Sequence, residues 1–147
     1  MEQQGLTDHF SFQDAAFSPT GARFGIDNTP PDDMLPVLLD TAQRMEEVRH
    51  MLGDKPVVVH SWYRSAAVNA LVGGVPDSAH RTGYAVDFVC PPWVNIEACQ
   101  TILNHGVPFN QLILEYGWIH IDFSPTFKGQ VLTKQSSTTP YLTGLVA

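Results

Sequence analysis

Apolar residues recur every three or four positions after the segment "NTPP" at 28–31, and this spacing predicts a long helix with one buried face. The recurring positions are Leu35, Leu38, Leu39, Ala42, Met45, Val48 and Leu52. The segment "NTPP" offers an Asn or Thr cap followed by prolines that suit a first helical turn, and Gly53 ends the pattern. Shorter helices are predicted over "SAAVNALVGG" and over "NIEACQTILNHG", the latter with Asn95 as its cap.

Short apolar runs predict the strands of a sheet. A buried strand is expected at 57–62, a second in "YAVDFVC" and a last one in "QVLTK". The segment "QLILEYGWIHIDF" gives two further runs, and a tight turn at Tyr116-Gly117 would make them adjacent antiparallel strands. Because helices and strands are mixed without a βαβ repeat, we expect an α+β domain in which helices pack on a small, mainly antiparallel sheet.

Composition and charge narrow the classes of function. A chain of 147 residues with 44% hydrophobic content fits one globular domain over residues 1–147, which we expect to be monomeric. A net charge of −7, with only eight Lys and Arg, argues against binding to nucleic acid. No apolar run reaches the ~18 residues of a membrane span, and "MEQQGLTDHFSF" lacks the features of a secretory signal. We therefore expect synthesis in the cytoplasm and no insertion into a membrane.

Two predicted strands carry polar residues among apolar neighbours. Asp87 lies between Val86 and Phe88, and a buried charge of this kind needs a cation, a set of donors or a metal ion. His120 lies between two isoleucines in the same way. Together with His80 they form a His/Asp/His set, which suits a zinc ion whose fourth position is open to water. A histidine on an apolar strand can also be a hydrogen-bonded core residue, so spacing alone leaves both interpretations open.

The segment "SAHRTGYAVD" at 78–87 resembles the SxHxxGxAxD signature of the zinc peptidases of the D-alanyl-D-alanine carboxypeptidase type. That family also includes phage endolysins and D,D-dipeptidases. All five fixed positions match, namely Ser78, His80, Gly83, Ala85 and Asp87. The segments "SWYRSAAVNALVGG" and "QLILEYGWIHIDF" extend the resemblance over about residues 6–123. The resemblance implies a hedgehog/D,D-peptidase-like zinc peptidase fold and the stem peptide of peptidoglycan as substrate.

The resemblance also implies roles for individual residues. It makes His80, Asp87 and His120 the zinc ligands. Glu115 would be the catalytic base, and Arg64 would stabilise the developing oxyanion or bind a carboxylate of the substrate. Three more residues are expected to contact the substrate, namely Tyr63, Ser78 and Trp118.

The position of the base departs from one branch of the family. In the dipeptidases the base lies three residues before the last histidine, where this chain has Gly117. Glu115 lies five residues before His120 instead. Asp122, two residues after His120, faces the same side of the strand and is an alternative base or a hydrogen-bonding partner.

Two functions from different classes follow from these residues. The first is a zinc peptidase that cuts the peptidoglycan stem, as an endolysin released through a holin pore, a lysin carried by a phage or a bacterial murein peptidase. The second is a non-catalytic relative that binds the wall or has a structural role. Residues able to activate water favour the first. The bond remains open between L-Ala–D-Glu, D-Ala–diaminopimelate and D-Ala–D-Ala.

Overall fold

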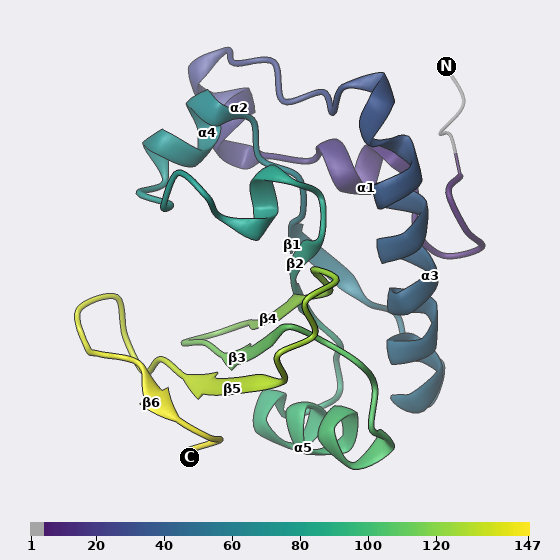
Figure 1. The fold of residues 1–147 in the computed structure, drawn as a ribbon, viewed down its shortest axis with the longest axis vertical. Helices are drawn as coiled ribbons and strands as arrows, with labels where there is room; N and C mark the ends of the chain where they lie inside the picture. The colour runs from purple at the N-terminus through teal and green to yellow at the C-terminus, as the bar shows by residue number, and fades with distance from the viewer. Residues whose placement is uncertain (1–4) are drawn as a thin grey trace.

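A six-stranded sheet organises residues 5–147, which a computed structural model describes (Figure 1). Its strands are β1 (Val58–Ser61), β2 (Ala85–Val89), β3 (Gln111–Leu114), β4 (Ile119–Asp122), β5 (Gln130–Thr133) and β6 (Leu142–Thr143). They lie in the order β1-β2-β4-β3-β5-β6. Every neighbouring pair is antiparallel except β3 and β5, which are parallel. The expected α+β fold with a mainly antiparallel sheet is therefore confirmed.

The helices pack around this sheet. They are α1 (Phe12–Ala16), α2 (Pro19–Phe24), α3 (Leu35–Met51), α4 (Ala66–Leu71) and α5 (Asn95–His105), with short 3-10 turns η1 (Asp32–Met34) and η2 (Ala79–Arg81). The longest helix, α3, runs along one side of the molecule, and α5 lies beneath the sheet near β5 (Figure 1). Of the helices in the described part of the chain, none is both long and apolar enough to cross a membrane.

The alternation of side chains along β2 and β4 separates the core from the functional face. Val86 and Phe88 of β2 are fully buried, and they pair with Ile121 and Ile119 of β4. All four belong to the hydrophobic core that α3 and α5 complete. Because successive strand residues point to opposite faces, the intervening Asp87 emerges on the other side of the sheet. The apolar face thus fixes the register that presents the polar residues.

Two expected helix caps are wrong. The helix α3 ends close to the expected Gly53, but its N-cap is Met34, which makes no side-chain capping bond. The cap of α5 is Val94, and Asn95 is the first helical residue. Residue type alone suggested each cap, whereas the chain enters α3 through the turn η1 and begins α5 one residue earlier than expected.

The strand expected at 57–62 is an edge strand rather than a buried one. Among residues 5–147, β1 pairs with β2 alone, and the side chains of Val58 and His60 face solvent. Of the elements in the described residues, the α-helices α1 and α2, the strand β6 and the two 3-10 turns were not predicted. The first four residues, part of the start that showed no secretory signal, lie outside the described residues.

Asn28, expected as a cap, instead joins three separate segments. Its amide donates to the carbonyls of Ala16 and Tyr63 at 3.1 and 3.0 Å, and its side-chain oxygen accepts the Ser65 N–H at 2.8 Å. The residue is 7% exposed, so water cannot readily replace these bonds. Asn28 therefore fixes the segment that carries Arg64, between its partners Tyr63 and Ser65.

We predict that Asn28→Ala lowers the free energy of unfolding by about 2–3 kcal/mol, because buried partners lose their hydrogen bonds. Chemical denaturation measures this change. The matched control is Asn104→Ala, at an exposed position of α5, which should change stability by less than ~0.5 kcal/mol. Equal effects of the two variants would contradict the role given to Asn28.

Candidate functional site

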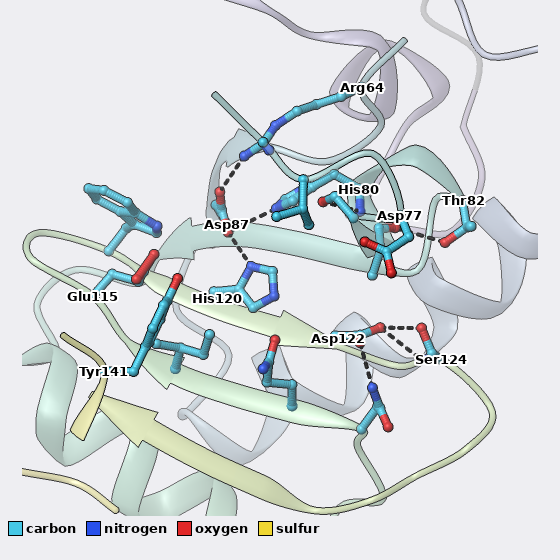
Figure 2. Close-up of a pocket in the computed structure, with 18 of the residues that line it drawn as sticks. Arg64, Asp77, His80, Thr82, Asp87, Glu115, His120, Asp122, Ser124 and Tyr141 are labelled. Atoms are coloured by element: carbon cyan, nitrogen blue, oxygen red, sulfur yellow. Dashed lines mark hydrogen bonds and ion pairs between the residues drawn. The ribbon is translucent and has the colours of Figure 1, made fainter. Parts of the chain in front are cut away.

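The polar face of the sheet forms the floor of a cavity of about 540 Å³. Residues of β2, β3 and β4 line the floor, and the segment from Gly74 to Thr82 forms a wall above it. Figure 2 shows His80, Asp87 and His120 meeting in the middle of this cavity. Segments that are far apart in the sequence therefore converge here.

Asp87 and His120 are brought together by the sheet itself. They are directly opposite each other in the β2–β4 ladder, and His120 Nδ1 lies 2.8 Å from Asp87 Oδ1. His80 comes from η2, whose first turn is capped by the Ser78 hydroxyl, which accepts the His80 N–H at 3.2 Å. One ligand atom from each of the three residues lies within 4.8 Å of the others. The sequence-based grouping of these residues is thus reproduced in space.

The ring of His80 is oriented by the core. Its Nδ1 lies 2.7 Å from the Trp62 carbonyl, which can only accept a hydrogen bond, so Nδ1 carries the proton. Its Nε2 is then a lone pair, buried and without a hydrogen-bond partner among the described residues. This lone pair lies 3.2 Å from the carboxylate oxygen Asp87 Oδ1. Two such electron-rich atoms at this distance suit a cation held between them.

The charges of the site depend on each other. Burial alone would raise the pKa of Asp87, but the nearby His80 and His120 outweigh it and hold that pKa below its usual range. Burial lowers the pKa of His80, and the opposing effect of Asp87 is smaller. Burial would also lower the pKa of His120, but its hydrogen bond to Asp87 leaves that pKa raised. Asp87 is therefore an anion, and it opposes the lowering effect of burial on the pKa of both histidine rings.

Arg64 lies above Asp87 at the exit of β1 (Figure 2). Its three guanidinium nitrogens donate to Ser61 Oγ at 3.3 Å, Asn69 Oδ1 at 3.3 Å and Asp87 Oδ2 at 3.4 Å. Asn69 is itself buried, and its amide donates to the Val75 carbonyl at 2.8 Å. The guanidinium is thus held rigidly next to the two histidines.

Gly74 allows this arrangement by its size. A Cβ at Gly74 would collide with the side-chain oxygen of Asn69. The glycine therefore lets the wall of the cavity approach the amide that orients Arg64.

Glu115 is the first residue after β3, in the turn before β4. Its N–H donates to the Trp118 carbonyl at 3.0 Å, which closes the expected hairpin and places Glu115 on the same side as His120. One carboxylate oxygen, Oε1, is buried and has no hydrogen-bond partner in the described part of the chain. Burial raises the pKa of Glu115. A carboxylate that is free to accept a proton thus borders the site.

Asp122 also lines the cavity, but its oxygens are occupied. Oδ1 accepts the N–H and the hydroxyl of Ser124 at 2.8 and 2.6 Å, and Oδ2 accepts the Asn110 amide at 2.9 Å. The geometry therefore favours Glu115 over Asp122 as the base. Asp122 instead orders the loop that follows β4.

The three residues expected to contact substrate have different positions. Ser78 and Trp118 line the cavity. Tyr63 does not, and this corrects the expectation, because its side chain is only 6% exposed and packs in the interior. In "SWYRS" the side chain of Tyr63 is therefore buried, whereas that of Arg64 lines the cavity.

Tyr141 borders the cavity and was not identified from the sequence. It precedes β6 and extends toward Glu115 (Figure 2). Burial raises the pKa of its hydroxyl, and the nearby Glu115 adds to the effect. No motif marks this tyrosine, since only the pairing of β5 with β6 brings it to the site.

The chain is similar in sequence to known proteins. The family model of peptidase M15 matches residues 8–122. A zinc D-Ala-D-Ala carboxypeptidase from Streptomyces albus G is 35% identical over 68 residues, which make up 46% of this chain and 27% of the relative. The match therefore represents only about a quarter of that relative's length.

We predict a pH dependence of stability in protein stripped of metal. The raised pKa of His120 means that its stabilisation is fully present below the unfolded pKa of ~6.5 and is lost as the pH rises through the folded pKa. His80, with a lowered pKa, changes stability only below that pH. The melting temperature of chelator-treated protein should therefore fall above pH ~6.5.

The variant His120→Gln should lack this fall, whereas His50→Gln, at a highly exposed position, should retain it. A flat profile in the unaltered protein, or the same fall in His120→Gln, would contradict the assignment to His120.

Proposed function

The chain belongs to the peptidase M15 family, and on that premise we propose that it is a zinc-dependent peptidase that hydrolyses a bond in the peptidoglycan stem. The observation that carries the proposal is the convergence of His80, Asp87 and His120 beside the free carboxylate of Glu115. We take residues 1–147 as one catalytic domain.

Zinc fits these donors. The ion is commonly held by imidazole nitrogens and carboxylate oxygens, and catalytic sites use three protein ligands with one open position. The buried lone pair of His80 Nε2 and a carboxylate oxygen of the anionic Asp87, 3.2 Å apart, are donors of this kind. When bound, zinc would act as a Lewis acid and lower the pKa of a bound water to about 7. The Trp62 carbonyl would keep His80 in the tautomer that ligation requires.

Glu115 is the residue that we propose moves the proton. It would accept a proton from the attacking water and deliver it to the amine that leaves. The raised pKa of Glu115 is closer to neutral pH than that of an ordinary carboxyl group. A carboxylate with a higher pKa is a stronger base. The Oε1 of Glu115 is free to accept a proton, whereas both oxygens of Asp122 already accept hydrogen bonds.

Arg64 is the residue that we propose stabilises negative charge. Its guanidinium is held by Ser61, Asn69 and Asp87, and is therefore preorganised before substrate arrives. The N–H groups that remain could donate to the oxygen of the bond under attack. Ser78 and Trp118 line the cavity and would contact the stem peptide.

We place the action of the enzyme at the cell wall, as a phage endolysin released through a holin pore or as a lysin carried by a phage. The supporting argument is the substrate, since peptidoglycan lies outside the cytoplasm. Lysis of expressing cells that depends on a coexpressed holin would support the first route. The alternative, a wall-binding module without activity, has no need of Glu115 and Arg64 beside the metal ligands.

We predict that metal binding and proton transfer can be separated by mutation. His80→Ala should lose both zinc and activity, whereas Glu115→Gln should keep one zinc per chain and lose ~100-fold or more in rate. Elemental analysis and release of peptide from purified peptidoglycan measure the two effects.

The matched control is Glu97→Gln, on the exposed side of α5, which should keep both properties. Freshly purified protein without zinc would reject the metal site. Protein with zinc that adheres to cell walls without cleaving them would support the wall-binding alternative.

We predict that Arg64→Ala lowers kcat more than it raises KM, because a donor to developing charge acts mainly in the transition state. Arg64→Lys should restore only part of the rate, since a point charge lacks the planar fork. The exposed Arg23, replaced by Ala, is the control. An unchanged kcat with a raised KM would mean that Arg64 only binds a carboxylate of the substrate.

A further inference from the structure

The cavity continues on both sides of the proposed metal ligands. Glu115 and Tyr141 lie on one side of His80, Asp87 and His120 (Figure 2). On the opposite side lie Asp77, Thr82, Asp122 and Ser124. The strand β4 explains this layout, because it begins beside Leu114, next to Glu115, and ends opposite Gln111, with His120 between. A peptide bound at the centre has space for residues in both directions.

The charge of the lining disfavours a terminal carboxylate. Four carboxylates border the cavity, namely Asp77, Asp87, Glu115 and Asp122. Of the described residues that line it, Arg64 is the only Lys or Arg. Each of its three nitrogens already donates to a protein acceptor, including the anion Asp87. An enzyme that removes the last residue of a peptide needs a cation for that residue's carboxylate, whereas Arg64 is paired with Asp87 and its remaining N–H groups are those proposed to bind the oxygen of the bond under attack.

The end beyond Asp122 is polar and acidic. Asp122 is 4% exposed, and its carboxylate oxygens accept hydrogen bonds from Asn110 and Ser124. Asp77 is exposed above it on the opposite wall. The neighbouring groups of Gln111 and Thr126 are an amide and a hydroxyl. The amide and the hydroxyl suit the uncharged amides of a continuing peptide, whereas the carboxylates of Asp77 and Asp122 repel a free carboxylate.

The end at Glu115 has the same preference. Lys134 is the nearest cation there, but its ammonium donates to the Thr139 carbonyl at 2.7 Å and lies 4.5 Å from the centre of the Tyr141 ring. It does not line the cavity. Trp118 lines this end, and its ring centre lies 4.5 Å from that of Tyr116. Among the described residues, neither end therefore offers a cation as partner for a terminal carboxylate.

We infer that this groove cuts a bond inside the stem peptide, with substrate residues bound on both sides, rather than releasing the C-terminal residue. The inference depends on the proposed function, since it concerns which bond the same site hydrolyses. It separates this chain from the carboxypeptidase activity that the name of its Streptomyces relative gives.

The test uses two synthetic stem pentapeptides that differ only in a C-terminal carboxylate or amide. Zinc-loaded protein is incubated with each, and products are identified by mass spectrometry. We expect cleavage at an internal bond in both, with rates within about threefold, since the groove does not bind the terminus. Release of the single C-terminal residue, with at least tenfold loss on amidation, would overturn the inference and leave the proposed function intact. No cleavage of either peptide or of intact peptidoglycan would reject both.

Binding provides a second readout that does not need turnover. Glu115→Gln protein, titrated calorimetrically with the two pentapeptides, should bind the amide at least as tightly as the acid. Tighter binding of the acid by tenfold or more would contradict the inference.

Substitution of the exposed Asp77 tests whether negative charge in the groove disfavours a terminal carboxylate. A shortened stem peptide, cut so that its free carboxylate falls within the groove, should be cleaved more slowly than its amide. Asp77→Arg should reduce this difference several-fold, whereas Asp33→Arg, on the exposed turn η1, should not. An unchanged ratio in Asp77→Arg would overturn the argument from charge.

Discussion

The arrangement of this site depends on one cross-strand pair, Asp87 of β2 and His120 of β4. Their neighbours on both strands are fully buried in the core, so the register cannot shift without exposing that core. A shift by one residue would also turn the carboxylate into the interior, where an unpaired charge is costly. The hydrophobic core therefore stabilises the fold and, by the same contacts, holds two of the proposed metal ligands opposite each other.

The remaining groups are attached to this pair by buried polar contacts. The Trp62 carbonyl orients His80, and Asn69 and Asp87 orient Arg64. Asn28 fixes the backbone on either side of Arg64. These groups need to be rigid, because a donor contributes to catalysis only if it is already aimed where charge develops. The polar network therefore holds the side chains of the proposed site in fixed positions on a small sheet.

The sequence predicted those parts of the structure that leave a local pattern. The long helix, the two central strands and the grouping of His80 with Asp87 follow from periodicity and a short motif. The cap assigned to Asn28 was wrong because its partners come from residues 16, 63 and 65, which no local pattern connects to it. Tyr63 was expected to contact the substrate. It does not line the cavity, because the turn after β1 buries Tyr63 and leaves the adjacent Arg64 at the site. Tyr141 was missed because it reaches the site only through strand pairing near the C-terminus.

The residues that the family model matches carry the proposed chemistry, whereas part of the cavity that would select the bond lies after them. Residues 8–122 contain the proposed ligands, the base and the arginine, whereas Ser124, Thr126 and Tyr141 follow the matched region and border opposite ends of the cavity. A metal site activates water in the same way whichever amide lies beside it, so the choice of bond must come from groups farther along the groove. Here those groups come partly from the segments that follow β4, whereas β2 and β4 hold the proposed reacting centre. Membership of the family therefore constrains the reaction more tightly than the bond that is cut.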